Sequence, residues 1–155
     1  MRDADRELLR PELVFLGMDA PDRASLFSQL GARLAPLGYV TPDWLERIEE
    51  RERAYPTGLA TATVGIALPH ADGCVARPYI AIVRPLAPVA FESMAGVGDT
   101  VEAELVLNLG VTREGGQVEV LQGLMNLFMQ EDPVRRLMAQ TTGEGMVSTL
   151  LEFLG

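Results

Sequence analysis

The sequence contains a single histidine, His70, at the end of a short apolar run. An imidazole can act as a nucleophile, a general base or a metal ligand, because its ordinary pKa lies close to physiological pH. Residues 64–68 are apolar and partly β-branched, which is typical of a buried strand, and Pro69 then ends the strand. His70 therefore lies where a rigid scaffold commonly presents functional groups. A lone histidine is nevertheless more often structural than chemical, so its companions decide its interpretation.

A charged helix and a glycine turn precede this strand and could supply those companions. Residues 46–53 carry glutamate or arginine at almost every position, and the run ends just before Pro-Thr-Gly at 56–58. The last arginines, among them Arg51, could reach toward a group held at that turn, since a planar guanidinium suits phosphate. The alternative is a solvated helix face, whose ion pairs contribute only about 0.2–0.5 kcal/mol each.

Length and composition favour one globular domain, residues 1–155, in which residues 1–10 form a less ordered or peripheral segment. The net charge of -9 argues against a nucleic-acid surface, which needs clustered lysine and arginine. The single cysteine, Cys74, cannot form an internal disulfide, and the sequence offers no cluster for zinc, so we expect neither a metal nor a cofactor. The charged N-terminus and the lack of a long apolar stretch predict a cytoplasmic protein without membrane insertion.

The spacing of apolar residues predicts helices, then a group of strands, then helices again. Strands are expected at residues 13–16, 64–68, 79–83, 89–91 and 101–111. Helices are expected at 19–36, capped by Asp19 or Asp22, at 41–53, capped by Thr41, at 118–128, from 132, and from 142 or 143. This order indicates an α/β fold, a three-layer-like sandwich of helices around a central mixed β-sheet. The absence of a glycine-rich nucleotide-binding motif argues against a Rossmann domain or a P-loop.

Three short segments occur in a fixed order along the chain. They are Arg-Glu-Arg at 51–53, Pro-Thr-Gly-Leu at 56–59 and Gly-Ile-Ala-Leu-Pro-His at 65–70. Together they resemble the IIA components of the bacterial sugar phosphotransferase system, fructose/mannitol class. The likeness extends over about residues 13–154, and Pro-Thr-Gly-Leu, Asp72 and Arg-Pro at 84–85 are closest to the galactitol-type branch. The resemblance implies the mannitol/fructose-type IIA fold.

The resemblance also implies a phosphotransferase that works as a phosphoryl carrier. His70 would accept phosphate from the phosphocarrier HPr and pass it to a cysteine of a IIB component, which serves a membrane IIC component. A neutral imidazole nitrogen is a competent nucleophile, and a phosphohistidine divides one transfer into two steps. Both partners would dock on an apolar, transient surface around His70, for which Leu59, Leu68 and Met94 are candidates. The alternative is a regulatory IIA-like protein, in which phosphorylation of His70 controls partner binding.

The resemblance assigns four further residues to the site. Arg51 matches the family's arginine before the Pro-Thr turn and would stabilise the phosphoryl oxygens during transfer. Thr57 offers a hydroxyl and a backbone amide as a second donor. Gln117 stands where mannitol-type members carry a second histidine, and it can donate a hydrogen bond but carries no charge. Asp72 could orient the His70 ring, or it could only shape the turn.

Overall fold

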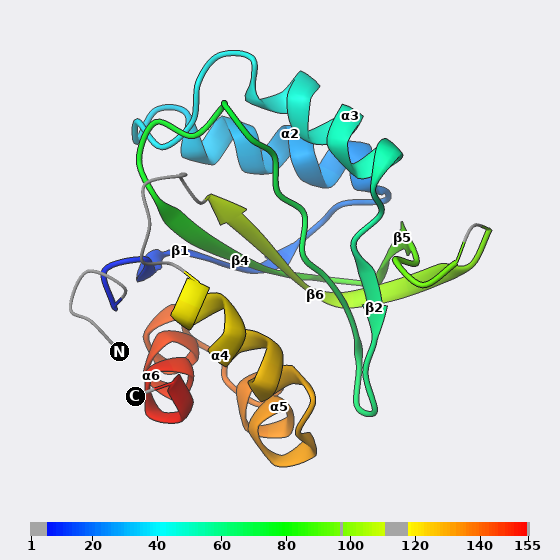
Figure 1. Ribbon diagram of the computed structural model, residues 1–155. Helices are drawn as coiled ribbons and strands as arrows, with labels where there is room; N and C mark the ends of the chain where they lie inside the picture. The colour runs from blue at the N-terminus through cyan, green and yellow to red at the C-terminus, as the bar shows by residue number, and fades with distance from the viewer. Residues whose placement is uncertain (1–5, 97, 111–117, 155) are drawn as a thin grey trace.

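A six-stranded mixed sheet forms the centre of the molecule (Figure 1). The computed structural model describes residues 6–96, 98–110 and 118–154. The strands are β1 (Leu9–Met18), β2 (Gly58–Ala60), β3 (Gly65–Ala67), β4 (Tyr79–Pro85), β5 (Val89–Glu92) and β6 (Thr100–Gly110). They are ordered β1-β4-β6-β3-β2, and β5 pairs with β6. The β1–β4 and β3–β6 pairs are parallel and the other pairs are antiparallel, which confirms the predicted mixed sheet.

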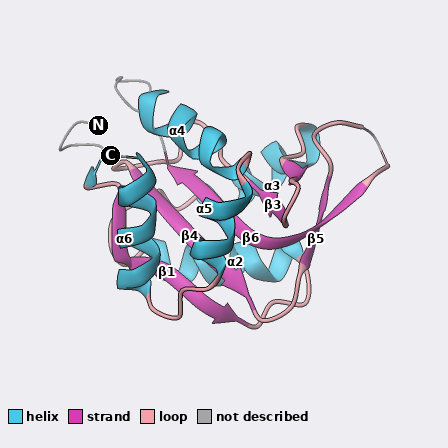
Figure 2. Ribbon diagram, turned by 90° about the horizontal axis from the view of Figure 1, so that it is seen from below, coloured by secondary structure: helices cyan, strands magenta, loops and turns pink. Residues whose placement is uncertain are grey.

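Helices cover both faces of this sheet. Helices α2 (Arg23–Leu34) and α3 (Trp44–Ala54) lie on one face. Helices α4 (Val118–Phe128), α5 (Glu131–Met138) and α6 (Gly143–Leu154) lie on the other, as Figure 2 shows from that side. The predicted three-layer arrangement is therefore confirmed. In the described part of the chain, no helix is long and apolar enough to cross a membrane.

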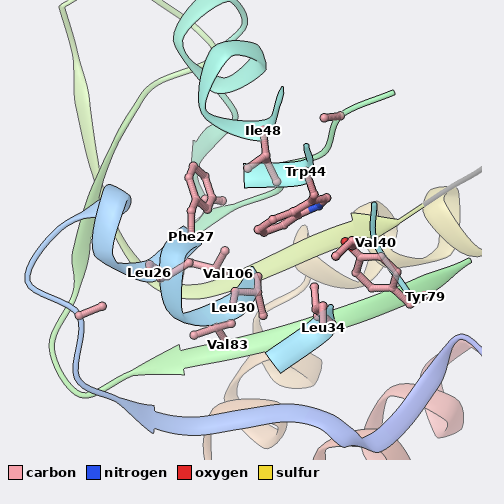
Figure 3. Packing of buried hydrophobic residues seen from close by; sticks show 14 of the residues in the cluster. Leu26, Phe27, Leu30, Leu34, Val40, Trp44, Ile48, Tyr79, Val83 and Val106 are labelled. Atoms are coloured by element: carbon pink, nitrogen blue, oxygen red, sulfur yellow. The ribbon is translucent and has the colours of Figure 1, made fainter. Parts of the chain in front are cut away.

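The α2–α3 layer is held by apolar side chains at helical spacing. Helix α2 fully buries Leu26, Leu30 and Leu34, and each such burial contributes roughly 1.5–3 kcal/mol. The Phe27 ring meets the Trp44 ring of α3 edge-on, with 6.5 Å between the ring centroids. Figure 3 shows these side chains together above β4 and β6. This packing fixes the position of α3 relative to the sheet.

A second apolar core lies under α4, α5 and α6. The sequence of β6 becomes continuously apolar because helices cover both faces of this strand. Leu105 and Leu107 face the core with α4–α6, whereas Val106 faces the core with α2 and α3. The strand predicted at 101–111 is confirmed as far as Gly110, since Val111 lies outside the described residues, and it lies at the centre of the sheet.

The start of α3 differs from the prediction. Thr41 was expected to cap the helix, but α3 begins at Trp44, with Asp43 in the N-cap position. The Thr41 hydroxyl donates to the Asp43 carboxylate instead, and the Trp44 amide donates to the Thr41 carbonyl over 3.1 Å. A turn therefore replaces the first predicted helical residues.

Two other boundaries lie near the N-terminus. Helix α2 begins at Arg23 rather than at residue 19, and Asp22 caps it by accepting from the Ser25 amide over 2.8 Å. One of the two predicted caps is thus confirmed. Leu8 and Leu9 are buried, so the expected peripheral character of residues 1–10 does not hold for them. They pack into the core under α4–α6, where β1 pairs with β4.

Candidate functional site

The segment that carries His70 is bonded to the central strand of the sheet. After β3, the Pro69 carbonyl accepts from the Leu109 amide over 3.1 Å and from Asn108 Nδ2 over 3.0 Å. Asn108 is 0% exposed, and its Oδ1 accepts from the Tyr79 hydroxyl over 2.6 Å. Burial raises the pKa of Tyr79, so its hydroxyl keeps the proton that it donates. These bonds anchor His70 to β6.

The His70 ring has two different neighbours. Its Nδ1 lies 2.9 Å from the Leu68 carbonyl oxygen, and a carbonyl only accepts, so Nδ1 carries the proton. In the neutral ring Nε2 then holds the free lone pair. Nε2 lies 3.5 Å from Arg51 Nη2, and the ring is half-buried. The nitrogen able to act as a nucleophile therefore faces a guanidinium.

Arg51 reaches the site from the last turn of α3. Its guanidinium carbon lies 4.4 Å from the centre of the Tyr55 ring, a cation–π contact that limits where the charge can go. From the sequence, Arg51 could also have belonged to a solvated helix face. In the structure its side chain is half-buried and contacts His70. Where the chain is described, no three histidine, cysteine, aspartate or glutamate side chains are grouped to hold a metal ion. The arrangement suits an anionic group attached to the imidazole.

Thr57 does not offer its donors to that group. Its amide donates to Glu52 Oε2 over 2.7 Å, and its hydroxyl donates to Glu52 Oε1 over 2.7 Å. The same hydroxyl accepts from the Leu68 amide over 3.2 Å. The structure thus assigns both Thr57 donors to Glu52, in place of the phosphoryl group expected from the sequence.

Glu52 is a site residue that sequence reasoning missed. The charged run suggested a solvated position, but the side chain is 1% exposed. Burial raises the pKa of its carboxyl, while the two hydrogen bonds from Thr57 oppose that shift. A signal was present, because Trp44, Ile48 and Glu52 follow one another at four-residue spacing and share the buried face of α3.

Asn108 was also missed, although it is the one polar residue in the apolar run 105–109. Such a residue in a buried strand must find partners, and it does so with Tyr79 and Pro69. This single polar position marks where β6 supports the site.

Asp72 and Gln117 complete the predicted set. Asp72 is exposed, its carbonyl accepts from Arg47 Nη1 over 3.4 Å, and Gly73 follows with a φ of +74°. Among the hydrogen bonds of the described residues none joins Asp72 to His70, whose Nδ1 donates to Leu68 instead. The turn-shaping alternative therefore fits Asp72 better. Gln117 lies outside the described residues.

The three apolar candidates for partner contact differ in exposure. Met94 is 46% exposed, and its amide donates to the Gly58 carbonyl over 2.9 Å, next to Thr57 in the chain. Leu59 is half-buried and Leu68 is buried, so neither presents a full side chain. Tyr55, which the sequence did not single out, is 63% exposed beside Arg51.

Comparisons with known proteins show what the chain is similar to. The galactitol-specific EIIA component of Escherichia coli (strain K12) is 29% identical over 122 residues, which cover 78% of this chain and 81% of that protein. The nitrogen regulatory protein IIA-Ntr from Neisseria meningitidis is similar in structure, with a TM-score of 0.75 at 25% identity, over 96% of this chain and 99% of that one. The Escherichia coli enzyme IIAMTL, solved in complex with phosphorylated enzyme IIBMTL, gives 0.73 at 25% identity, over 93% and 97%.

The family described as "Phosphoenolpyruvate-dependent sugar phosphotransferase system, EIIA 2" matches residues 7–152, nearly the whole chain. The match includes the histidine, the arginine and the turn between them. The chain therefore belongs to this family, the fructose/mannitol/galactitol class of IIA components, and it is a phosphoryl carrier of the phosphotransferase type.

Proposed function

We propose that Nε2 of His70 is the atom that carries the phosphoryl group. The observation that carries this proposal is the pair of ring contacts, with Nδ1 donating to the Leu68 carbonyl and Nε2 facing Arg51. The Nε2 lone pair attacks the phosphorus of a phosphorylated donor protein, a new N–P bond forms, and the bond to the donor's nitrogen breaks. Nδ1 keeps its proton throughout, so no proton transfer limits either step.

The second transfer reverses this bonding at Nε2. A thiolate of the acceptor attacks the phosphorus, an S–P bond forms, and Nε2 regains its lone pair. Arg51 supports both steps, because charge on the equatorial phosphoryl oxygens is stabilised by a guanidinium placed beside the reacting nitrogen. The half-buried position of both side chains strengthens this interaction relative to open water.

We further propose HPr as the donor and a IIB cysteine as the acceptor, with a membrane IIC component downstream. The similarity to an enzyme IIA solved with its phosphorylated IIB partner supports the acceptor. The exposed Tyr55 contacts Arg51, and the exposed Met94 is hydrogen-bonded to Gly58 at the start of β2, the strand that follows α3, so both are candidates for the shared docking face. A cytoplasmic location stays a prediction.

Incubation with the general phosphotransferase proteins and phosphoenolpyruvate tests the proposal. The wild-type protein should gain one acid-labile phosphate on His70, and addition of the cognate IIB should remove it. The His70→Ala variant should gain none, although its circular dichroism spectrum matches the wild type. Equal labelling of His70→Ala would refute the assignment.

The structural similarity to IIA-Ntr favours one second candidate, a regulatory role in which the phosphorylation state of His70 controls partner binding. The same assay separates the two functions. Rapid transfer from His70 to a cognate IIB cysteine supports sugar uptake. A stable phosphohistidine that changes the affinity for another protein, without such transfer, supports regulation.

A further inference from the structure

We propose that Glu52 and Thr57 are positioning residues that determine which nitrogen of His70 is the nucleophile. The inference rests on the proposed function and deepens it, because it names the groups that hold Nε2 ready for phosphoryl transfer. Neither residue contacts the reacting nitrogen. Both act through the backbone of Leu68.

An unbroken line of contacts joins the buried carboxylate to the ring. Glu52 accepts from the Thr57 hydroxyl over 2.7 Å, and that hydroxyl accepts from the Leu68 amide over 3.2 Å. The carbonyl of the same Leu68 accepts from His70 Nδ1 over 2.9 Å. Each group in this line is buried, except the half-buried ring at its end.

The direction of each bond depends on the carboxylate. A threonine hydroxyl has one hydrogen, and a carboxylate that accepts from Thr57 takes it. The hydroxyl oxygen then has only lone pairs to offer, and it presents one of them to the Leu68 amide. The Thr57 amide, which donates to the second oxygen of Glu52 over 2.7 Å, fixes the carboxylate in this orientation. Without Glu52 the hydroxyl could rotate and point its hydrogen elsewhere.

Leu68 is held from the other side as well. A residue before proline is restricted to extended backbone, which limits the direction of the Leu68 carbonyl. The next carbonyl, that of Pro69, is fixed by Asn108 and the Leu109 amide. Glu52 and Thr57 therefore supply the missing constraint at the β3 end of the segment.

The consequence concerns the proton on the ring. In a neutral imidazole the protonated nitrogen is selected by the hydrogen bond that the other groups offer. A fixed Leu68 carbonyl selects Nδ1 for the proton, which leaves Nε2 free toward Arg51. If Leu68 moves, the proton can occupy Nε2, and the lone pair then points away from the arginine.

Two buried threonines offer a matched comparison. Thr57 and Thr149 are both buried, and the Thr149 hydroxyl donates to the Gly145 carbonyl over 2.8 Å within α6. Thr57→Val and Thr149→Val each remove one buried hydroxyl, but only the first breaks the line to Leu68. The readout is the pair of ¹⁵N chemical shifts of the imidazole in neutral protein, and His70 is the only histidine, so the signals need no assignment.

The wild type and Thr149→Val should show a protonated Nδ1 and an unprotonated Nε2. Thr57→Val should show a mixture of the two tautomers and transfer from phosphorylated HPr about 10- to 100-fold slower, the size of effect seen when outer hydrogen-bond partners of ligating histidines are lost. Thr57→Ser, which keeps the hydroxyl, should restore both readouts. An unprotonated Nδ1 in the wild type overturns the proposal, as does a wild-type tautomer in folded Thr57→Val.

Glu52→Gln provides a second route if Thr57→Val does not fold. Its side-chain amide accepts through one oxygen only, so a mixed tautomer is again expected, and a pure Nδ1–H ring would overturn the proposal. The tautomer is measured without any phosphate. A wild type that has the Nδ1–H ring but gains no phosphate from HPr refutes the proposed function alone.

Discussion

Replacing Arg51 with alanine should slow phosphoryl transfer by about 100- to 1,000-fold, the usual effect of removing one donor that stabilises developing charge. That loss corresponds to about 2.7–4 kcal/mol of transition-state stabilisation. Arg51 Nη2 lies 3.5 Å from Nε2, so an oxygen of a phosphoryl group on that nitrogen falls within its reach. No other arginine side chain is bonded to His70 among the described residues, so nothing there replaces the lost charge.

The same substitution should hardly affect folding. The contact of the guanidinium with the Tyr55 ring is worth about 0.5–1 kcal/mol at an exposed site, and Tyr55 is exposed. The free energy of unfolding, measured in urea, should therefore fall by no more than about 1 kcal/mol. A large kinetic effect with a small stability effect is the pattern expected of a group that acts mainly in transfer.

The assay measures transfer from phosphorylated HPr by rapid quench under single-turnover conditions. Two further variants are compared with Arg51→Ala. Arg53→Ala removes an exposed arginine two residues along the same helix and should leave the rate within about twofold. Arg51→Lys keeps the charge but loses the planar fork, so an intermediate rate is expected. A rate for Arg51→Ala within threefold of the wild type would show that this guanidinium does not stabilise the transferring group.

Three further predictions concern other residues. Arg84→Met should lower the free energy of unfolding by about 1.5–3 kcal/mol without slowing transfer, because Arg84 Nη1 donates to the Met138 and Gln140 carbonyls at the end of α5, over 3.0 and 2.6 Å. Burial raises the pKa of Glu52 above 4.5 in the folded protein. The free energy of unfolding of the wild type, relative to that of Glu52→Gln, should therefore fall as pH rises through the pKa of Glu52 in the folded state. Urea unfolding between about pH 4 and pH 8 measures this difference. The family resemblance implies one neutral hydrogen bond from Gln117 to the phosphoryl group, so Gln117→Ala should slow transfer only about fivefold in the same rapid-quench assay.

The fold could be predicted because its elements follow the periodicity of apolar residues. Strand β6 and helix α2 carry long, regular patterns, and both were located from them. Strand β2 was missed, because Gly-Leu-Ala has neither the length nor the β-branched residues of a strand signal. Its glycine is needed for packing, since a Cβ at Gly58 would overlap the Glu92 carbonyl, and this contact between distant segments leaves no trace in local sequence.

The site could be predicted in part. His70 and Arg51 were paired from the family resemblance, and the structure places them in contact. Thr57 was found, but its partner was not, because residue type alone does not distinguish a buried glutamate within a run of charges. Only the helical phase from Trp44 and Ile48 distinguishes Glu52 from its neighbours. The roles of Thr57 and Asn108 depend on which groups meet across the fold, and residue type alone does not determine that.

The two reacting side chains belong to different layers, and their spacing is therefore set by the core between those layers. His70 is bonded to the sheet through Pro69, while Arg51 extends from a helix seated on Phe27, Leu30 and neighbouring side chains. Protein interiors are packed closely enough that a lost methylene shifts what rests upon it. A conservative change in the core such as Ile48→Val can thus lengthen or shorten the distance between the Arg51 guanidinium and His70 Nε2. Substitutions in the apolar core can therefore change the rate of phosphoryl transfer in this carrier, while the side chains of the site itself stay the same.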